Sequence, residues 1–363
     1  MVLKAISLFS GAGGMDVGVA NAGFDIIAAN ELDPHACKTY RENHQRCTLY
    51  EGDIEQHIDI LKKYMDVDLI IGGPPCQGFS VAGKMDPKDP RSKLVFTYCK
   101  VVESVRPKAF IMENVKSLGS LSKFQPIREE IFRQMENLGY SVSMVILNAK
   151  DFGVPQSRER VFFIGVKGQS KLITLSCFDK YKEKAVSLRD AISHLGKAGT
   201  ANNKNITKAK ITLAEKPVLR KSPYAGMLFN GQGRPLNPDA WSSTLPASMG
   251  GNRTPIIDEE HLYDNKPSWV ESYHKDLLKG AVKSEYKNAP PRLRRLTVDE
   301  AIILQTFPSD YKFLGPQSKV FSQIGNAVPC KLAQVVATVV KDILLGGATS
   351  LDADEQLSLL SCG

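Results

Sequence analysis

The stretch Asp68–Ser80, DLIIGGPPCQGFS, determines how this 363-residue chain is interpreted. Its first part is short, apolar and rich in β-branched residues, which is typical of a buried strand. The two glycines that follow adopt backbone angles closed to other residues, and the two prolines fix φ and remove two donors. Cys76 comes directly after this turn, so we expect its thiol at the carboxyl end of the strand, where open α/β sheets bind ligands. The pattern predicts that Cys76 is a nucleophile; an inert buried cysteine is the alternative.

Apolar segments of strand and helix length alternate on both sides of this stretch. Strands are expected at residues 4–9, 24–30, 48–50, 68–71, 108–115, 140–147 and 161–166, and helices at 15–22, 34–43, 93–105 and 125–138. This alternation predicts an α/β fold with a doubly wound, mostly parallel sheet. Further along, Thr297 and Glu300 have the spacing of a helix-starting capping box, and another apolar helix is expected after Pro329.

The composition is that of an ordinary globular protein, with 42% hydrophobic and 24% charged residues. No apolar run reaches the roughly 18 residues of a membrane span, and residues 1–10 read as a first strand rather than a signal peptide. The seven cysteines are odd in number and include no C-x-x-C pair, so we expect neither a disulfide framework nor a zinc site. A reducing, cytoplasmic location fits this cysteine usage.

The charge is unevenly distributed along the chain. Residues 167–295 hold 23 Lys and Arg against 12 Asp and Glu, whereas the remainder is slightly acidic. Such a segment favours contact with a polyanion such as nucleic acid, and a solvated lysine surface is the alternative. The strand and helix pattern fades from about residue 186, and glycine-rich turns appear. We therefore predict a first domain at 1–185 completed by 320–346, an irregular second domain at 186–319, and a loose tail at 347–363.

Several polar residues stand where the expected strands end. Residues 10–14 form a glycine-rich turn between a strand and a helix, which lets a ligand approach the backbone. Glu31, about 20 positions further on, lies where ribose-binding α/β folds place a hydroxyl acceptor. Asp53 either caps the next helix or contacts an adenine. Glu113 is either a carboxylate with a function in the same layer as Cys76 or a helix cap.

Two arginines follow shortly afterwards. Arg158 and Arg160 alternate onto one face if the chain is extended there. Two guanidinium groups near a carboxylate suit a planar or phosphate ligand, and surface salt bridging is the alternative.

Eight short motifs, taken together and in this order, resemble the DNA (cytosine-5) methyltransferases of the prokaryotic type. They span nearly the whole chain except its basic middle part, and the combination of Pro75-Cys76-Gln77 with Glu113-Asn114-Val115 is already specific. The motifs are SLFSGAGG (7–14), NELD (30–33), GDI (52–54), GGPPCQGFS (72–80), MENV (112–115), QSRER (156–160), RRLTVDEAIILQTFP (294–308) and QIGNAVP (323–329).

The resemblance implies a mechanism in which a thiolate makes C5 of cytosine reactive. Cys76 would add to C6 of the base, so that C5 can attack the sulfonium methyl group of S-adenosyl-L-methionine and give 5-methylcytosine. Glu113 would protonate or hydrogen-bond N3, and Arg160 would contact O2. Arg158 would help to position substrate or phosphate. Because C5 and C6 are stacked inside a duplex, the target base must leave the helix, as the substrates of methyltransferases do.

The resemblance also implies the S-adenosylmethionine-dependent methyltransferase fold, with the cofactor across the carboxyl edge of the sheet and no metal. The turn after the first strand would surround the methionine moiety, Glu31 the ribose and Asp53 the adenine. The full predicted set is Phe9, Ser10, Gly11, Ala12, Gly13, Gly14, Glu31, Leu32, Asp53, Ile54, Pro75, Leu94, Asn326, Ala327 and Val328.

The basic domain would be the target recognition domain for double-stranded DNA. Thr244-Leu245 is similar to the family's short Thr-Leu element, and residues 77–92 would close over the extruded base. Lysines would set affinity, while a few side chains read base edges. The residues expected to contact DNA are Gln77, Ser80, Gln156, Arg234, Thr244 and Arg253.

We expect a monomeric enzyme with no membrane association that belongs to a restriction–modification system. One alternative is a tRNA cytosine-5 methyltransferase on the same fold; Gln77-Gly78-Phe79-Ser80 and the long basic insert favour DNA. The other alternative is a catalytically silent DNA-binding protein, against which the intact Cys76, Glu113 and Arg160 argue.

Overall fold

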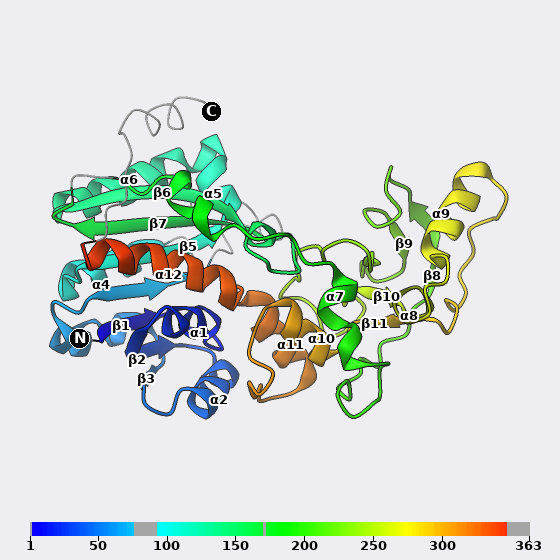
Figure 1. Ribbon diagram of the computed structural model, residues 1–363, viewed down its shortest axis with the longest axis horizontal. Helices are drawn as coiled ribbons and strands as arrows, with labels where there is room; N and C mark the ends of the chain where they lie inside the picture. Colours follow the sequence, from blue (N-terminus) through cyan, green and yellow to red (C-terminus); the bar gives the residue numbers. More distant parts are fainter. Residues whose placement is uncertain (1, 76–92, 170–171, 347–363) are drawn as a thin grey trace. The chain divides into compact units, whose positions relative to one another are not determined.

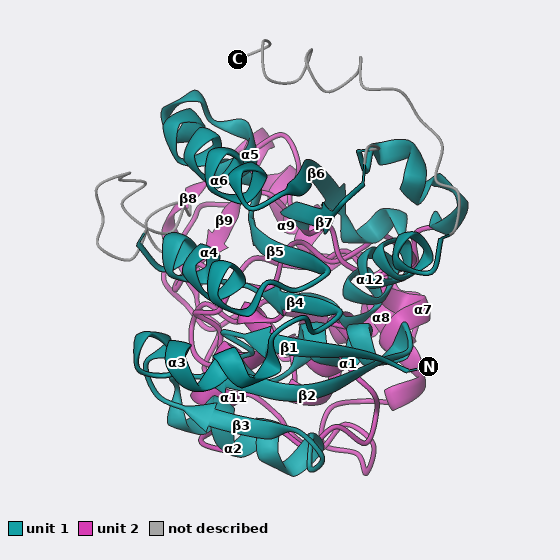
Figure 2. Cartoon of the chain, turned by 90° about the vertical axis from the view of Figure 1, so that its left-hand side faces the viewer, with its two compact units in different colours: residues 1–152, 159–183, 328–363 teal, residues 153–158, 184–327 magenta. Residues whose placement is uncertain are grey.

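The computed structural model describes residues 2–75, 93–169 and 172–346, and these fall into two compact units (Figures 1 and 2). The described residues up to 152, residues 159–183 and those from 328 onward form the first unit. Residues 153–158 and 184–327 form the second unit. The larger part of the second unit, residues 184–327, is therefore inserted between the last strand of the first unit and its last helix, and residues 153–158 precede that strand.

The first unit contains a seven-stranded sheet with the strand order β3-β2-β1-β4-β5-β7-β6. Every neighbouring pair is parallel except those of β7, which runs antiparallel to both β5 and β6. This confirms the predicted mostly parallel sheet. The strands are β1 (Leu3–Leu8), β2 (Phe24–Glu31), β3 (Thr48–Glu51), β4 (Leu69–Gly72), β5 (Ala109–Val115), β6 (Tyr140–Asn148) and β7 (Glu159–Lys167).

Helices cover both faces of this sheet, as expected for a doubly wound fold. Figure 2 shows α4 and α6 on one side of the sheet and α1 and α12 on the other. The helices of the first unit are α1 (Gly14–Asn21), α2 (Pro34–Asn43), α3 (Ile58–Leu61), α4 (Lys93–Val105), α5 (Lys116–Ser120), α6 (Gln125–Asn137) and α12 (Cys330–Leu344). Its 3₁₀ helices are η1 (Ile54–Gln56), η2 (Lys62–Tyr64), η4 (Ser122–Phe124), η5 (Ala149–Asp151) and η6 (Leu175–Tyr181).

Two close contacts hold elements of the first unit together. Helices α1 and α12, from the two ends of the chain, pack so closely that a Cβ at Gly18 would overlap the carbonyl oxygen of Cys330. On the other face, the buried Tyr98 hydroxyl of α4 donates to the carbonyl oxygens of Ile70 (3.1 Å) and Ile111 (3.0 Å). This hydroxyl therefore joins β4 to β5, the two strands that lead to the predicted catalytic residues.

The second unit is built from short elements around two small apolar cores. Strands β8 (Leu213–Val218) and β9 (Met227–Phe229) form one antiparallel pair, and β10 (Ile256–Asp258) and β11 (Leu293–Arg295) form another. The predicted capping box is present, since Thr297 and Glu300 bind each other's backbone N–H groups. The helices are α7 (Leu188–Ile192), η7 (Ser193–Leu195), α8 (Glu259–Tyr263), α9 (Trp269–Lys279), α10 (Val298–Leu304) and α11 (Gln317–Asn326).

The compact units differ in detail from the predicted functional domains. Residues 153–158 belong to the second unit, and so does α11, part of which the sequence assigned to the completed first domain. Residues 294–308 begin with strand β11 before they become helical. The predicted tail at 347–363 lies outside the described residues. Within the described ranges, no helix is long and apolar enough to cross a membrane, and no group of three or more His, Cys, Asp or Glu side chains could hold a metal ion.

Candidate active site

The carboxyl ends of β3, β2, β1, β4 and β5 lie along one edge of the sheet because these neighbouring strands are parallel. Predicted cofactor residues follow four of these strands: Phe9 after β1, Glu31 at the end of β2, Asp53 after β3 and Pro75 after β4. The chain leaves β1 toward β2 and leaves the neighbouring β4 in the opposite direction, toward β5. Open α/β sheets bind ligands at such a position. The register of the sheet therefore gathers residues that are far apart in the sequence.

The turn after β1 has an unusual backbone. Gly11 and Gly13 have φ values of 56° and 87°, in the left-handed region that glycine adopts without strain. Phe9 also has a positive φ, 54°, which costs a non-glycine residue about 1 kcal/mol. Such outliers persist only where the surrounding structure holds them, and they concentrate at ligand sites. The turn ends at the N-terminus of α1, whose first-turn N–H groups favour a polar ligand.

Glu31 connects this turn to the neighbouring strand. Its Oε2 accepts the N–H of Gly11 and its Oε1 accepts the N–H of Asp33, both at 2.7 Å. Burial raises the pKa of Glu31 above its usual value, although these two N–H groups oppose the shift. A carboxylate has about four lone-pair positions, so Glu31 retains capacity to accept hydroxyl donors from a ligand.

Other predicted cofactor residues take varied positions. Leu32 is 67% exposed, whereas Ile54 is buried in the core beside the sheet edge. The Asp53 carboxylate accepts the N–H of Glu55 at 3.0 Å and caps η1, so the helix-cap interpretation of Asp53 describes this structure. Leu94 lies half-buried on α4 and packs against the same core.

Glu113 and Arg160 form an ion pair at the end of β5. The Arg160 Nε and Glu113 Oε1 atoms are 2.7 Å apart, and the two side chains are 13% and 12% exposed. The register explains the pairing: Arg160 of β7 lies opposite Val115, two residues from Glu113, and alternate residues of a strand share a face. Arg160 therefore reaches the carboxylate across neighbouring strands rather than along the chain.

The same corner touches the turn that leads to Cys76. The amide of the buried Asn114 donates to the carbonyl oxygen of Pro74 at 3.1 Å. A Cβ placed on Gly73 would lie 3.0 Å from Glu113 Oε2, so the carboxylate sits against the glycine backbone. The predicted residues Cys76, Gln77 and Ser80, and the rest of the predicted closing segment 77–92, lie outside the described residues.

Gln156 and Arg158 occupy a different environment from the one the sequence suggested. Their side chains are 0% and 2% exposed, and both belong to the second unit. Arg158 Nη1 and Nη2 donate to the carbonyl oxygens of Leu245 (3.1 Å) and Gly325 (2.8 Å). Gln156 accepts the N–H of Leu245 at 3.0 Å. The structure thus binds these two side chains to backbone, whereas the sequence had predicted contacts with DNA and substrate.

Gln305 is a residue with a positioning role that the sequence did not reveal. It is fully buried, receives a hydrogen bond from the amide of Gln156 at 3.0 Å, and donates to the carbonyl oxygens of Ile324 (2.6 Å) and Ala327 (3.2 Å). Gln305 therefore holds the segment that carries the predicted Asn326 and Ala327. The available signal was a glutamine immediately after an apolar helix, which is too common to have been singled out.

The remaining predicted residues of the second unit are at its surface. Arg234, Thr244, Arg253 and Asn326 are exposed. The Thr244 hydroxyl donates to the carbonyl oxygen of Ser157 at 2.7 Å, next to the Gln156 and Arg158 contacts.

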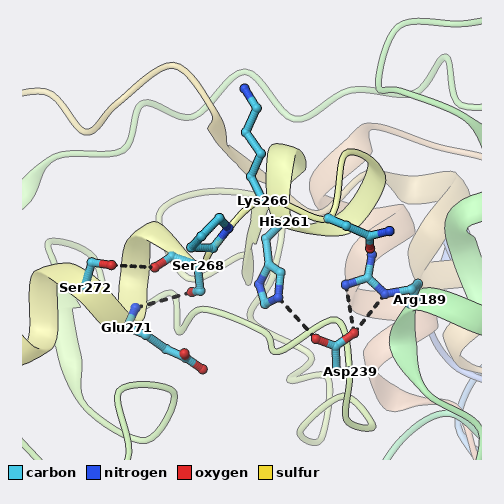
Figure 3. A pocket seen from close by; sticks show the side chains of 9 residues that line it. Arg189, Asp239, His261, Lys266, Ser268, Glu271 and Ser272 are labelled. Carbon is cyan, nitrogen blue, oxygen red and sulfur yellow. Dashed lines mark hydrogen bonds and ion pairs between the residues drawn. The ribbon is translucent and has the colours of Figure 1, made fainter.

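The second unit also has a polar hollow of about 360 Å³ (Figure 3). Arg189 and His261 both contact Asp239 there, at 2.7 and 3.1 Å, so the Asp239 carboxylate offsets the charge of Arg189. None of the predicted site residues lines this hollow. It has no evident connection with the chemistry of the sheet edge.

Comparisons with known proteins agree with the sequence motifs. Residues 3–342 match the family model for C-5 cytosine-specific DNA methylases. The Type II methyltransferase M1.HphI of Haemophilus parahaemolyticus is 36% identical over 354 residues, which cover 94% of this chain and 87% of that protein. The Type II methyltransferase M.FnuDI of Fusobacterium nucleatum is 33% identical over 350 residues, with 94% and 95% covered.

A solved structure extends the comparison to the fold. An Escherichia coli prophage protein, described as a DNA modification methyltransferase, superimposes with a TM-score of 0.67 at 26% identity. The match covers 94% of this chain and 99% of that one. The chain belongs to the C-5 cytosine-specific DNA methylases, and its activity is methylation of DNA cytosine at C5.

Proposed function

We propose that the enzyme methylates one cytosine in a specific double-stranded DNA sequence, through a covalent bond between Cys76 and C6 of an extruded base. The observation that carries this proposal is the Glu113–Arg160 ion pair at the end of β5, with the Glu113 carboxylate against Gly73 of the turn leading to Cys76. Glu113 as the proposed acid and Arg160 as the proposed contact of O2 lie together there, and Cys76, which follows the same turn in the sequence, is the proposed nucleophile.

The methyl donor that the family implies is S-adenosyl-L-methionine, which supplies an electrophilic methyl group when bound. The residues at the sheet edge fit such a molecule: Glu31 offers a carboxylate for ribose hydroxyls, and the strained turn 9–14 opens its backbone toward a ligand. Leu32, Pro75 and Leu94 offer apolar surface, and Asp53 a carboxylate. The proposed set also includes Ile54, whose side chain is buried in the core beside the sheet edge. Asn326, Ala327 and Val328 complete the proposed set, with Ala327 held by Gln305.

In the proposed mechanism, the Cys76 thiolate forms a bond to C6 while N3 receives a proton from Glu113. Electron density would then move to C5, which would take the methyl group that a bound sulfonium donor supplies as it becomes a neutral thioether. Loss of the C5 proton to a base and return of the N3 proton to Glu113 would expel the thiolate and restore the aromatic ring. The Arg160 Nε lies 2.7 Å from Glu113 Oε1, so the guanidinium group stands beside this acid. Arg160 can then turn its guanidinium group to O2 of the base.

We assign DNA binding to the basic second unit, with Arg234, Thr244 and Arg253 as its contacts, and to Gln77 and Ser80. Because Gln156 and Arg158 are buried and bind backbone, we assign them to the framework rather than to contacts with DNA or substrate. The full-length relatives are Type II methyltransferases, which supports a role in a restriction–modification system. A cytoplasmic monomer that acts on the cell's own DNA completes the proposal.

The test is methyl transfer from labelled S-adenosyl-L-methionine to duplex DNA, with bisulfite sequencing of the product and transfer RNA as a parallel substrate. The wild-type enzyme and a Cys177→Ser control should methylate DNA at one recurring sequence, and Cys76→Ser should be inactive. On DNA containing 5-fluorocytosine, which has no C5 proton to lose, only the enzymes with Cys76 should remain covalently attached. Methylation by Cys76→Ser at the wild-type rate would refute the mechanism; labelling of transfer RNA alone would refute the substrate.

A further inference from the structure

Two glycine-rich turns of the second unit, residues 230–234 and 248–254, pack against each other. The N–H of Gly233 donates to the carbonyl oxygen of Asn252 at 3.1 Å. A Cβ at Gly231 would overlap the Asn252 side chain, and one at Gly233 would overlap the Thr254 carbonyl oxygen. The turns therefore meet backbone to backbone, which glycine at these two positions permits. We call residues 230–234 and 248–254 the paired loops.

Further hydrogen bonds anchor the first of the paired loops at its base and close the second one on itself. The Asn230 amide donates to the Thr212 hydroxyl (2.9 Å) and to the carbonyl oxygen of Leu213 (2.8 Å). In the other loop, the N–H of Gly250 donates to the Thr254 hydroxyl at 3.0 Å, and the N–H of Thr254 donates to the Gly251 carbonyl at 3.0 Å. The paired loops thus form one element with little freedom to shift.

Arg295 is buried against both of the paired loops. Its Nη1 donates to the Thr254 carbonyl at 2.8 Å and its Nη2 to the Lys210 carbonyl at 3.2 Å, and a Cβ on Gly233 would overlap Nη1. In the part of the chain that the structure describes, no carboxylate pairs with this guanidinium group, and its Nε has no hydrogen-bond partner. Burial accordingly lowers the pKa of Arg295 to about 10. An uncompensated buried cation is costly, so its contacts with the loops need a functional explanation.

The neighbouring Arg294 shows the opposite arrangement. Its Nη2 lies 2.6 Å from Glu300 Oε1 and its Nε lies 3.0 Å from Glu259 Oε1. Two carboxylates therefore compensate Arg294, which joins the start of α8 to α10. Arg294 therefore joins two helices through ion pairs, whereas Arg295 binds only backbone carbonyl groups.

The paired loops expose the side chains of Gln232, Arg234, Asn252 and Arg253. Arginine binds the O6 and N7 atoms of guanine in a bidentate manner, and asparagine and glutamine bind the N6 and N7 atoms of adenine. The backbone of Gln232 has a φ of 66°, a left-handed conformation that the packed loop must maintain. Four side chains suited to base edges therefore project from one element whose geometry depends on buried contacts.

We propose that Arg295 is a positioning residue for sequence recognition, which fixes the paired loops so that Gln232, Arg234, Asn252 and Arg253 meet base edges in a set register. This rests on the proposed DNA-methylating function. Arg295 touches neither base nor cofactor, so its loss reduces discrimination between DNA sequences and leaves cofactor binding intact. Base-reading contacts confer discrimination only when their spacing is fixed, since each side chain must meet its donor and acceptor atoms at one base pair.

The experiment measures sequence discrimination by the full-length enzyme on a duplex DNA library randomised around a cytosine, read by bisulfite sequencing. The measured quantity is the methylation rate of the target divided by that of sites that differ by one base pair. Arg295→Met should lower this ratio about tenfold or more, and Arg295→Lys, which keeps a cation and a donor, should lower it less. The matched control, Arg133→Met on the exposed surface of α6, should keep the wild-type ratio.

Calorimetric titration with S-adenosyl-L-methionine should give the wild-type dissociation constant for both Arg295 variants. If Arg295→Met kept the wild-type ratio of target to off-target methylation rates, the proposal would be overturned. It would also be overturned if the affinity for S-adenosyl-L-methionine fell by the same factor as that ratio. If Arg295→Met does not fold, Gly233→Ala disturbs the same contact from the other side, and a wild-type ratio in that variant has the same consequence. Methylation of the library by the wild-type enzyme establishes the proposed function separately, so the two proposals fail on different measurements.

Discussion

The two units hold their polar groups in place by different means. At the sheet edge of the first unit, Glu31, Glu113 and Arg160 project from neighbouring strands, and the sheet's main-chain hydrogen bonds determine their spacing. In the second unit, the buried side chains of Arg158 and Arg295 bind loop carbonyl groups directly. The difference implies that Glu113 or Arg160, which pair with each other, can be lost without reshaping the sheet edge, whereas Glu31 also binds the backbone N–H groups of Gly11 and Asp33. Loss of Arg158 or Arg295 in the second unit, by contrast, changes the conformation of the loop backbone that these side chains bind.

The largest effect is expected for Glu113→Gln. The amide still accepts the hydrogen bond from Arg160 but cannot deliver a proton to N3, so kcat should fall about 10²–10⁴-fold. The unfolding temperature should change little because β5 and β7 keep their register. Single-turnover methylation and thermal unfolding measure the two quantities, with Glu129→Gln on the exposed surface of α6 as control. A rate within tenfold of wild type would show that Glu113 does not act as the acid.

Arg158→Met should affect stability more than chemistry. The change leaves the carbonyl oxygens of Leu245 and Gly325 without their buried donors, and each such loss costs about 1–3 kcal/mol. Denaturant unfolding, with limited proteolysis to locate the loosened segment, should report a loss of about 2–5 kcal/mol confined to the second unit. The matched change in the first unit, Arg160→Met, should mainly reduce the rate. Wild-type unfolding of Arg158→Met combined with a lost rate would instead assign Arg158 to substrate contact.

A smaller effect, dependent on pH, is expected from Asp16 in the first unit. This fully buried carboxyl of α1 accepts hydrogen bonds from Tyr40 (2.7 Å) and Ser7 (3.0 Å), and burial raises its pKa above its usual 3.8, while His44 opposes the shift. The native state then binds a proton more tightly than the unfolded chain. Stability from this group is complete below about pH 3.8 and is lost as the pH rises through the raised native pKa.

The comparison that isolates Asp16 is the pH dependence of the unfolding free energy in wild type and in Asp16→Asn. From pH 4 upward, wild type should lose stability relative to the variant by at most about 1.4 kcal/mol per pH unit, until the raised pKa is passed. The difference between the two proteins also includes a change at His44, since burial lowers the pKa of His44 and the Asp16 carboxylate raises it. If the difference in unfolding free energy between wild type and Asp16→Asn stayed constant across this pH range, Asp16 would have the same proton affinity in the folded and unfolded states.

The fold was largely predictable because each strand of the first unit is a short apolar run with its own turn signals. The seven described strands lie within about two residues of their predicted ranges, and α2 and α4 have the predicted limits. The clustering of Glu31, Asp53 and Pro75 followed from the same rule, since parallel strands end at one edge. The capping box at Thr297 was predictable because its contacts are local in sequence.

The other contacts were not predictable because they join residues far apart in the sequence and follow no period. Gln156 and Arg158 lie in a motif that suggested ligand contacts, yet their partners, Leu245 and Gly325, are about 90 and 170 residues away. The pattern of hydrophobic residues in a sequence does not indicate which polar side chains will be buried. The same holds for Arg295, which is indistinguishable from Arg294 until the structure shows that only one of them has carboxylate partners.

The close packing of α1 against α12 has a consequence for how the protein is made. Gly18 leaves the ribosome long before Cys330, so α1 waits roughly 15–60 s for the helix that covers it. All residues of the second unit are synthesised within that interval. We therefore expect that the second unit can fold during synthesis, while α1 and its side of the sheet still lack the helix α12. The enzyme can acquire its capacity for methyl transfer only after α12 has been made.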